Sequence, residues 1–487
     1  MTRTLHNRKT LGQVFTPEDV AQSLVHWAIR KETDRLLDPA CGDGRFLACH
    51  RGSVGVELDA GGAAAAKARA PWALIHEGDF FPWAAETRER FEAAVGNPPF
   101  IRYQRFSGPV RECAIAQAAR LGARFTRLTS SWAPFLVVTA SLLKPGGRLA
   151  FDVPAEIGHA PYATPVLESL CNHFDLVHVV AVRDKLFPDI SEDAWLFYAA
   201  GFGGRTESVE LSVQERFVFT STPPKPDKRV SLRMWREAGC RLRKFVLPDA
   251  ALDLYDELSS RKQVLKLGEV AHAGIGYVSG ANDFFHLRPS NARRLAIPDR
   301  ALRVAVRKAE QLPEEKVNHE TVRAWLRDDQ PVLLLNLGRM KSLPPEIKRY
   351  LEGEDGQAAR EAYKCRNRNP WYVVPDVRVP DAFLSYMSGV RPVLVRNDAE
   401  CVCTNSVHAV FVKPPWTVRA MQSVWSHPLV DLSCELEGHP LGGGLLKLEP
   451  REASNVRLPM KPLPITAGHK DLIRQATGEM RRWRHYA

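Results

Sequence analysis

Four short apolar segments in the first hundred residues each lead into a side chain that can bind a ligand. The segments are 35–38, 54–56, 73–76 and 93–95, and the side chains are those of Asp38, Glu57, Asp79 and Asn97. An alanine-rich stretch at 63–68 predicts a helix between the second and third segments. Parallel strands joined by helices end at one edge of a sheet, where open α/β sheets bind ligands. The pattern therefore predicts an α/β fold with a doubly wound, mainly parallel, Rossmann-like sheet.

The turn after the first segment contains two glycines, Gly42 and Gly44, separated by one residue. Glycines at this spacing allow a tight turn and a close approach of the backbone to a ligand. The third glycine of a dinucleotide site and the Lys-Ser/Thr pair of a phosphate loop are both missing. Asp38 stands where it would repel a pyrophosphate, so a ligand with an ammonium or sulfonium group suits this turn better.

Acidic residues after the next two strands predict how such a ligand would be held. Glu57 is placed to hydrogen-bond ribose hydroxyls at the end of the second strand. Asp79 can accept a hydrogen bond from an adenine amino group, and the neighbouring ring of Phe80 can pack on the purine. These residues together favour a ligand that contains adenosine.

The five residues from Gly96 to Phe100 predict a site for an exocyclic amino group. The carboxamide oxygen of Asn97 and the carbonyl of Pro98 can both accept hydrogen bonds from one NH₂ group. Pro98 has a fixed φ that holds its carbonyl stiffly, and the ring of Phe100 offers a stacking face for a base. Two accepted hydrogen bonds shift the amine lone pair onto nitrogen, where it can attack an electrophilic methyl group. The motif therefore predicts methylation of an amino nitrogen.

The order of these motifs resembles the gamma class of DNA adenine-N6 methyltransferases, which includes the TaqI-type enzymes. Residues 12–17 are similar to that family's amino-terminal motif, 38–44 to its Gly-rich cofactor loop, and 97–100 to its catalytic motif. Phe187, in a Leu-Phe-Pro context, is similar to the aromatic residue that forms the second face of the target-base sandwich. The resemblance covers residues 10–200 well and the rest faintly.

The resemblance implies a site-specific methyltransferase of a restriction-modification system. Its methyl donor would be S-adenosyl-L-methionine, and its target the N6 amino group of an adenine flipped out of duplex DNA. The implied catalytic residues are Asn97, Pro98, Phe100 and Phe187. The implied cofactor-binding residues are Thr16, Asp38, Ala40, Gly42, Gly44, Glu57, Asp79 and Phe80. This chemistry requires no metal ion and no general base.

The charge of the chain, +11 with a pI of about 9.2, indicates a polyanionic partner. Residues 241–487 contribute +9 of this charge, and 101–150 hold eight basic residues against one acidic residue. We expect arginines after the amino-group motif and in the loop 363–372 to contact double-stranded DNA, although ordinary solvated loops would also explain both sets. The expected DNA-binding residues are Arg102, Arg105, Arg124, Arg127, Arg366 and Arg368. Residues 481–484, at the end of the last predicted helix, are equally compatible with DNA contact and with a simple basic helix end.

The length of 487 residues predicts two domains. We expect a catalytic domain over 1–215, a linker over 216–240, and a mixed α/β target-recognition domain over 241–487. No apolar run approaches the roughly 20 residues of a membrane span, and the amino terminus lacks a secretory signal. The nine scattered cysteines lack the spacing of a zinc site, so a cytoplasmic protein with reduced thiols is expected. We expect a monomer on DNA, with any restriction endonuclease on a separate chain.

Two other classes of function fit parts of this pattern. An Asn-Pro-Pro-Phe motif also serves enzymes that methylate amino groups of RNA or protein, and this is the main alternative. Methylation of cytosine N4 is a lesser variant, because it more often uses Ser at the position of Asn97; carbon-5 methylation needs a Cys after proline, which Pro99 excludes. A non-catalytic DNA-binding subunit would show decayed motifs, whereas all of them are present.

Overall fold

The structure, a computed structural model, describes residues 16–187, 193–338, 340–441 and 443–486. The chain divides into two compact units, Met1–Pro248 and Asp249–Ala487. Residues 12–15 of the amino-terminal motif lie outside the described residues, whereas Thr16 is inside them.

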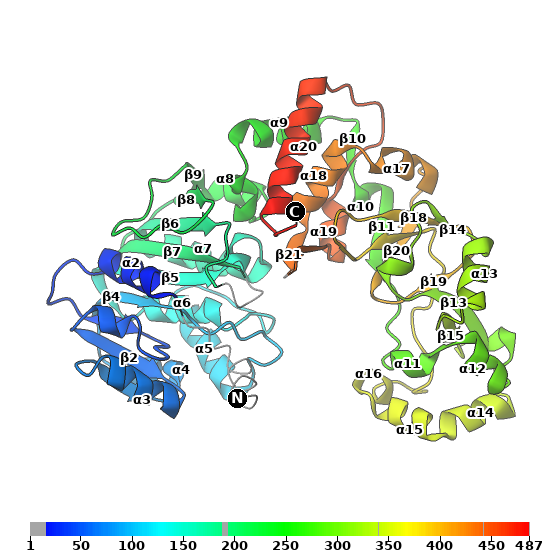
Figure 1. The fold of residues 1–487 in the computed structure, drawn as a ribbon, viewed down its shortest axis with the longest axis horizontal. Coiled ribbons are helices and arrows are strands. Elements are labelled where there is room, and N and C mark those ends of the chain that lie inside the picture. The colour runs from blue at the N-terminus through cyan, green and yellow to red at the C-terminus, as the bar shows by residue number, and fades with distance from the viewer. Residues whose placement is uncertain (1–15, 188–192, 339, 442, 487) are drawn as a thin grey trace. The chain divides into compact units, whose positions relative to one another are not determined.

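A nine-stranded sheet forms the centre of the first unit, in the order β3-β2-β1-β4-β5-β7-β6-β8-β9 (Figure 1). Strands β3, β2, β1, β4 and β5 run parallel to one another, and β7 then runs antiparallel between β5 and β6. The predicted doubly wound, mainly parallel sheet is therefore confirmed. Its strands are β1 Leu36–Asp38, β2 Ser53–Glu57, β3 Leu74–Glu77, β4 Phe91–Gly96, β5 Leu143–Pro154, β6 Phe174–Val182, β7 Ala194–Phe202, β8 Ser208–Gln214 and β9 Lys228–Ser231.

The helices of this unit cover the sheet and bury its apolar side chains. Helix α2 packs through Val20 and Leu24 against a core that includes Leu36 of β1 and Ala150 of β5. Every residue of α6 is buried, as expected of a helix that is apolar all round. The α-helices are α2 Glu18–Ala28, α3 Ala60–Arg69, α4 Phe80–Glu86, α5 Gly108–Arg120, α6 Trp132–Ala140, α7 Thr164–Cys171 and α8 Leu232–Glu237.

The strand order reverses direction between β1 and β4, and this topological switch point positions the candidate site. On one side the order runs from β1 to β2 and β3, and on the other from β4 to β5. Open α/β sheets bind ligands outside the carboxyl ends of the strands at such a point. Asp38 ends β1 and Asn97 follows β4, so these two predicted residues flank the switch point.

The stretch 216–240 differs from the expected linker, because β9 and α8 both lie within it. Strand β9 pairs antiparallel with β8, and Val230 is 1% exposed in that position. A four-residue strand is too short to stand out beside the Pro- and Lys-rich residues 222–229, so its pairing is visible only in the folded sheet. The division between the compact units falls after Pro248.

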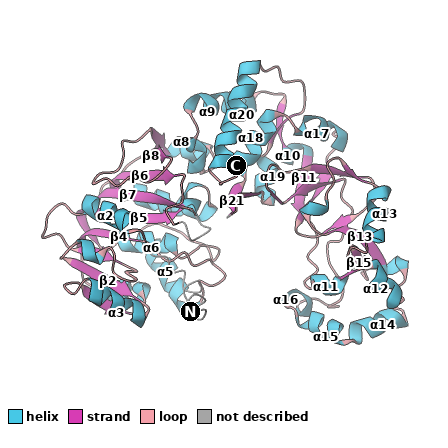
Figure 2. Ribbon diagram, in the orientation of Figure 1, coloured by secondary structure: helices cyan, strands magenta, loops and turns pink. Residues whose placement is uncertain are grey.

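The second unit contains several small sheets instead of one large sheet (Figure 2). The largest has the order β11-β20-β16-β18-β14, and a four-stranded sheet has the order β12-β15-β13-β19. Their strands are β11 Ala271–Ile275, β20 Val407–Val412, β16 Ala382–Ser385, β18 Leu394–Asn397, β14 Lys316–Val317, β12 His286–Leu287, β15 Leu333–Leu335, β13 Leu302–Val306 and β19 Val402–Cys403. Smaller sheets pair β10 Val264–Lys266 with β23 Arg457–Pro459, and β17 Met387–Ser388 with β22 Leu445–Lys447 and β21 His439–Leu441.

Helices surround these sheets, and the carboxyl-terminal helix is anchored by a buried ion pair. Arg484, just beyond α20, is 1% exposed, and its Nη2 and Nε donate to Glu435 Oε1 and Oε2 at 2.8 and 3.0 Å. The suggestion that Arg484 contacts DNA is therefore wrong, because its guanidinium is buried. The longer helices are α9 Asp249–Ser260, α13 His319–Arg327, α14 Pro345–Glu352, α15 Glu354–Glu361, α17 Val418–Trp425, α18 Pro428–Glu437 and α20 Ala467–Arg482; shorter ones include α11 Asn282–Phe285, α12 Pro289–Arg294 and α16 Tyr363–Arg366.

Candidate active site

The glycine-rich turn after β1 is held against β2 and α3. The backbone N–H of Gly42 donates to Glu57 Oε2 at 2.8 Å. Gly44 has a φ of +81°, and a Cβ there would lie 2.8 Å from the Cα of Ala66 in α3. Both the backbone conformation and the space therefore require glycine at position 44. The turn therefore packs tightly at the carboxyl edge of the sheet.

Asp38 is completely buried at the end of β1. Its Oδ1 accepts a hydrogen bond from the Ala40 N–H at 3.2 Å, and its Oδ2 has no hydrogen-bond partner among the described residues. Burial raises the pKa of this carboxyl well above its usual value, and the nearby charge of Glu57 raises it further. A buried acceptor without a partner is costly, so Asp38 fits a cationic ligand better than an empty core position.

Asp38 also brings the cofactor turn close to the amino-group motif. A Cβ built on Gly96 would lie 3.0 Å from Asp38 Oδ1. Strands β1 and β4 are neighbours, with Leu37 paired to Ala94, so the ends of both strands lie side by side. The absence of a side chain at Gly96 therefore permits the close approach of Asp38 to the strand that leads to Asn97.

Glu57 and Asp79 lie at the ends of the following strands, as predicted. Glu57 is buried, and its Oε1 accepts from the Asp59 N–H at 2.8 Å; each carboxylate oxygen keeps a second lone pair for a ribose hydroxyl. Asp79 precedes α4, its Oδ1 accepts from the Phe81 N–H at 2.9 Å, and burial raises the pKa of its carboxyl. The proposed hydrogen bonds of both residues to adenosine stay predictions.

Phe80 lies in the core of the first unit. Its ring is 3% exposed and stacks on Phe135 of α6, with centroids 5.0 Å apart and an interplanar angle of 18°. Its predicted packing on a purine stays a prediction, and Phe135 is the neighbour that the sequence reasoning missed. No local signal distinguishes Phe135, because the whole of α6 is apolar.

The loop that follows Asn97 is fixed by a serine from the start of α6. The Ser131 hydroxyl donates to the carbonyl of Pro99, and the N–H of Ile101 donates to Ser131 Oγ at 3.0 Å. The carbonyl of Pro98, in contrast, accepts no hydrogen bond from any residue that the structure describes. The Pro99 carbonyl therefore stabilises the loop, whereas the Pro98 carbonyl can accept a hydrogen bond from a ligand.

The two aromatic residues assigned to the target base lie in different environments. Phe100 is partly exposed in the loop after β4. Phe187 is 4% exposed and belongs to the core beneath α2. The structure shows no contact between the two rings among the described residues, so their pairing around a base stays a prediction.

Thr16 connects the Gly-rich turn to an acidic residue that the sequence reasoning missed. Its hydroxyl donates to Asp152 Oδ2 at 2.9 Å, and its carbonyl accepts from Arg45 Nη1 at 2.9 Å. Asp152 is 0% exposed near the end of β5, and no described residue hydrogen-bonds its Oδ1. Burial raises the pKa of Asp152 well above its usual value, and the charge of Asp38 raises it further. The available signal was a single acid within the otherwise apolar run 149–154.

The arginines after the amino-group motif are exposed. They lie on the loops before and after α5, between β4 and α6. Within the described ranges, three of them form no ion pair with an acidic side chain, so their charge is available to an anionic partner. The exposed residues are Arg102, Arg105, Arg124 and Arg127, and the three are Arg105, Arg124 and Arg127.

The two arginines predicted in the second unit differ in their surroundings. Arg368 Nη1 donates to the Ser279 carbonyl at 2.6 Å and so braces the loop that follows β11. The Arg366 guanidinium lies 5.6 Å from the ring centroid of Tyr363, and that tyrosine is 67% exposed. The structure therefore gives Arg368 a structural contact, whereas Arg366 and Tyr363 form an exposed pair.

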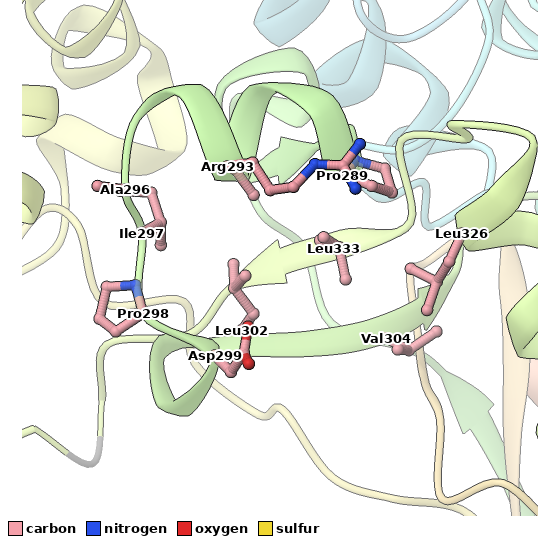
Figure 3. Close-up of a pocket in the computed structure, with 11 residues that line it drawn as sticks. Pro289, Arg293, Ala296, Ile297, Pro298, Asp299, Leu302, Val304, Leu326 and Leu333 are labelled. Atoms are coloured by element: carbon pink, nitrogen blue, oxygen red, sulfur yellow. The ribbon is translucent and has the colours of Figure 1, made fainter.

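A cavity of about 590 Å³ in the second unit contains none of the predicted site residues. It is lined mainly by apolar residues of α12 and the segment 296–298 after it, of β13 and β15, and of α13, with Arg293 and Asp299 as its charged residues (Figure 3). No group of three His, Cys, Asp or Glu side chains in the described part of the chain is arranged to hold a metal ion. Of the helices that the structure describes, none is both long and apolar enough to cross a membrane.

Comparisons with known proteins give the context for this geometry. Residues 241–484 match the family model described as "Type II methyltransferase M.Eco57I, C-terminal domain", which covers half of the chain. The chain belongs to this type II methyltransferase family. Residues 3–64 match the model described as "N-6 DNA Methylase".

Curated relatives match over most of the chain or over its first part. The type II methyltransferase M.XamI of Xanthomonas campestris pv. amaranthicola is 24% identical over 93% of this chain and 86% of its own length. The type II methyltransferase M.TthHB8I of Thermus thermophilus is 31% identical over 30% of this chain and 35% of its own length. Among solved structures, the type IIG restriction endonuclease BpuSI is 16% identical with a TM-score of 0.43, over 95% of this chain and 60% of that one.

The protein is thus a DNA N6 methyltransferase of restriction-modification type, with S-adenosylmethionine as its methyl donor. The residues at the sheet edge fit this donor. The buried Oδ2 of Asp38, which has no hydrogen-bond partner among the described residues, suits a positively charged group. Glu57 and Asp79 would supply the predicted acceptors for its ribose and adenine. Thr16 and the backbone of the Gly42 turn would complete the set of cofactor-binding groups.

Proposed function

We propose that the protein transfers a methyl group from S-adenosylmethionine to the N6 atom of an adenine that is rotated out of duplex DNA. The observation that carries this proposal is the position of the Asn97 motif, directly beside Asp38 at the switch point of the sheet. A cofactor held by the turn after β1 and an amino group held after β4 would therefore meet. Chemistry on a base requires its removal from the stack, at a cost of a few kcal/mol.

The residues of the Asn97 motif are proposed to bind the amino group and to orient it. Asn97 Oδ1 and the Pro98 carbonyl accept its two hydrogen atoms and direct the nitrogen lone pair at the donor. The hydrogen bonds of Ser131 to the neighbouring backbone keep the loop in place before the base arrives. S-adenosylmethionine supplies an electrophilic methyl group on a sulfonium. Positioning and fixed dipoles account for most of the rate enhancement in this scheme.

Phe100 and Phe187 are proposed to contact the two faces of the base. Phe100 is partly exposed and can stack on an entering ring without rearrangement. Phe187 is buried, so its contribution requires movement of its segment when DNA binds. The arginines around α5 would meet the phosphates near the extruded base, and the second unit would read the recognition sequence. We also propose a monomer on DNA and, where a restriction endonuclease exists, a separate chain for it.

The decisive experiment measures transfer from tritiated S-adenosylmethionine with Asn97→Ala. We expect a loss of at least about a hundredfold in methyl transfer to DNA, with cofactor affinity nearly unchanged, because Asn97 acts on the substrate amine. Asn172→Ala, an exposed amide at the end of α7, is the matched control and should retain activity. Near-normal transfer by Asn97→Ala would exclude the proposed role.

The same labelling experiment separates adenine from the other possible acceptors. DNA, RNA and protein substrates are incubated in parallel, and labelled DNA is digested to nucleosides for mass spectrometry. N6-methyladenine in duplex DNA is the expected product. Label found only in RNA, in protein or in N4-methylcytosine would replace the proposed substrate with that alternative.

A further inference from the structure

We propose that Asp152 is a second carboxylate, beside Asp38, for the ammonium group of the methionine part of the cofactor. This inference rests on the proposed function and deepens it, because it assigns a binding residue that the sequence motifs did not indicate. Asp152 lies near the carboxyl end of β5, the strand next to the one that leads to Asn97.

The sheet places Asp38 and Asp152 near the same carboxyl edge, on either side of β4. Side chains alternate between the faces of a strand, and Leu36 and Ala150 both belong to the core beneath α2. Asp152, two residues beyond Ala150, therefore points to that face. Asp38 Oδ1 lies against Gly96, which pairs with Phe151 at the end of β4. Only β4 separates their strands, and the register places Asp38 level with Val95 and Asp152 one residue beyond Gly96, so their Cα atoms are roughly 12 Å apart. A small cation beyond the carboxyl end of β4 can lie between the two carboxylates.

Thr16 fixes the orientation of the Asp152 carboxylate. Its hydroxyl occupies Oδ2 at 2.9 Å, and the carbonyl of the same residue is held by Arg45 Nη1 at 2.9 Å. Arg45 directly follows Gly44 of the Gly-rich turn, so the position of Asp152 is tied to the cofactor loop. This leaves Oδ1 without a hydrogen-bond partner among the described residues.

A purely structural role explains this arrangement poorly. An acceptor for Thr16 alone could be a neutral side chain, whereas a fully buried carboxylate with one unpartnered oxygen destabilises the empty protein. Asp38 repeats the same condition, with one oxygen bonded to the backbone and one unpartnered. Two such carboxylates, on either side of the end of β4, match an ammonium ion and repel an anion.

The test compares the binding of S-adenosylhomocysteine with that of its deamino analogue, which lacks only the amino group. Calorimetry is done with the full chain and with Asp152→Asn, whose amide oxygen can still accept from Thr16. The wild-type protein should bind S-adenosylhomocysteine at least about tenfold more tightly than the analogue. Asp152→Asn should weaken S-adenosylhomocysteine binding by about ten- to a hundredfold and change binding of the analogue by less than about threefold.

Asp34→Asn is the matched control, because Asp34 is also buried but accepts from the backbone N–H groups of Arg30 and Lys31 ahead of β1. It should leave the ratio of the two affinities unchanged. An unchanged ratio in Asp152→Asn, or an equal loss for both ligands, overturns this inference and leaves the proposed function intact. Failure of the folded wild-type protein to bind S-adenosylhomocysteine would overturn the proposed function together with it.

Discussion

Asparagine at position 152 is expected to make the cofactor-free protein more stable at neutral pH. Asp152 is fully buried, and Oδ1 has no hydrogen-bond partner within the described chain. An unsatisfied buried group costs about 1–3 kcal/mol, and more when it is charged. The new amide adds an NH₂ group that also lacks a partner. We therefore expect the free energy of unfolding to rise by about 1 kcal/mol, the lower end of that range. For a unit of this size, that corresponds to a rise in melting temperature of roughly 2–4 °C.

The pH dependence of this gain follows from the pKa of Asp152. Burial raises its native pKa above the unfolded value of about 3.9, so the native state binds the proton more tightly. The contribution of Asp152 to the free energy of unfolding is therefore fully present below that unfolded pKa. It is lost as the pH rises through the native pKa. The asparagine variant lacks this loss, so its advantage over the wild-type protein should grow from acid to neutral pH.

Thermal melts of both proteins without cofactor, at several values between about pH 4 and about pH 8, measure this effect. Asp34→Asn is again the control and should lose about 1 kcal/mol, because a neutral amide accepts the hydrogen bonds of Arg30 and Lys31 less strongly. A variant at position 152 that is no more stable than the wild-type protein at neutral pH would refute the reasoning. So would an advantage that does not change with pH.

Three further predictions follow from the site. Glu57→Gln should weaken S-adenosylmethionine binding by about tenfold in a calorimetric titration, since the neutral amide replaces a carboxylate that accepts two backbone N–H groups. Unchanged affinity would show that Glu57 does not bind the cofactor. Gly44→Ala should lower the free energy of unfolding by more than about 1 kcal/mol, because its Cβ would clash with α3. Gly122→Ala is the control: it has a φ of +78° and open space around it, so it should lose about 1 kcal/mol or less. Equal losses for the two variants in urea titrations would argue against tight packing at Gly44. Alanine at the three arginines near α5 that form no ion pair among the described residues should reduce the slope of log K for DNA binding against log salt by up to about 0.9 per arginine. Arg233→Ala, which removes an ion pair to Glu237, should leave this slope unchanged. A slope unchanged by the triple variant would contradict DNA contact there. The three residues are Arg105, Arg124 and Arg127.

Local sequence pattern predicted the part of the fold that carries the motifs. The apolar segments that end at Asp38 and Glu57 form β1 and β2, and the segment before Asn97 forms β4. Strand, turn and helix signals are local, and strands joined by helices run parallel, so their carboxyl ends lie along one edge of the sheet. For this reason a parallel α/β sheet can be inferred from the chain without knowledge of any long-range contact.

The pattern was less informative where a residue's role depends on distant neighbours. Arg368 and Arg366 look alike in sequence, yet one braces the Ser279 carbonyl and the other lies over an exposed tyrosine. The basic helix end suggested solvent or DNA around Arg484, whereas the fold supplies Glu435 and buries the pair. Nothing near these arginines in the sequence specifies a partner tens of residues away.

The sequence by itself determined which ligand-binding side chains follow the strands and in what order. It could do so because the direction and connection of these strands are set by short-range rules. Tertiary structure alone decided that Thr16 meets Asp152, a contact across 136 residues, and that Asp38 lies against Gly96. Such contacts form only when the strands pair and the helices pack on the sheet. The sequence would allow many neighbours for each of these residues, and close packing leaves room for one of them.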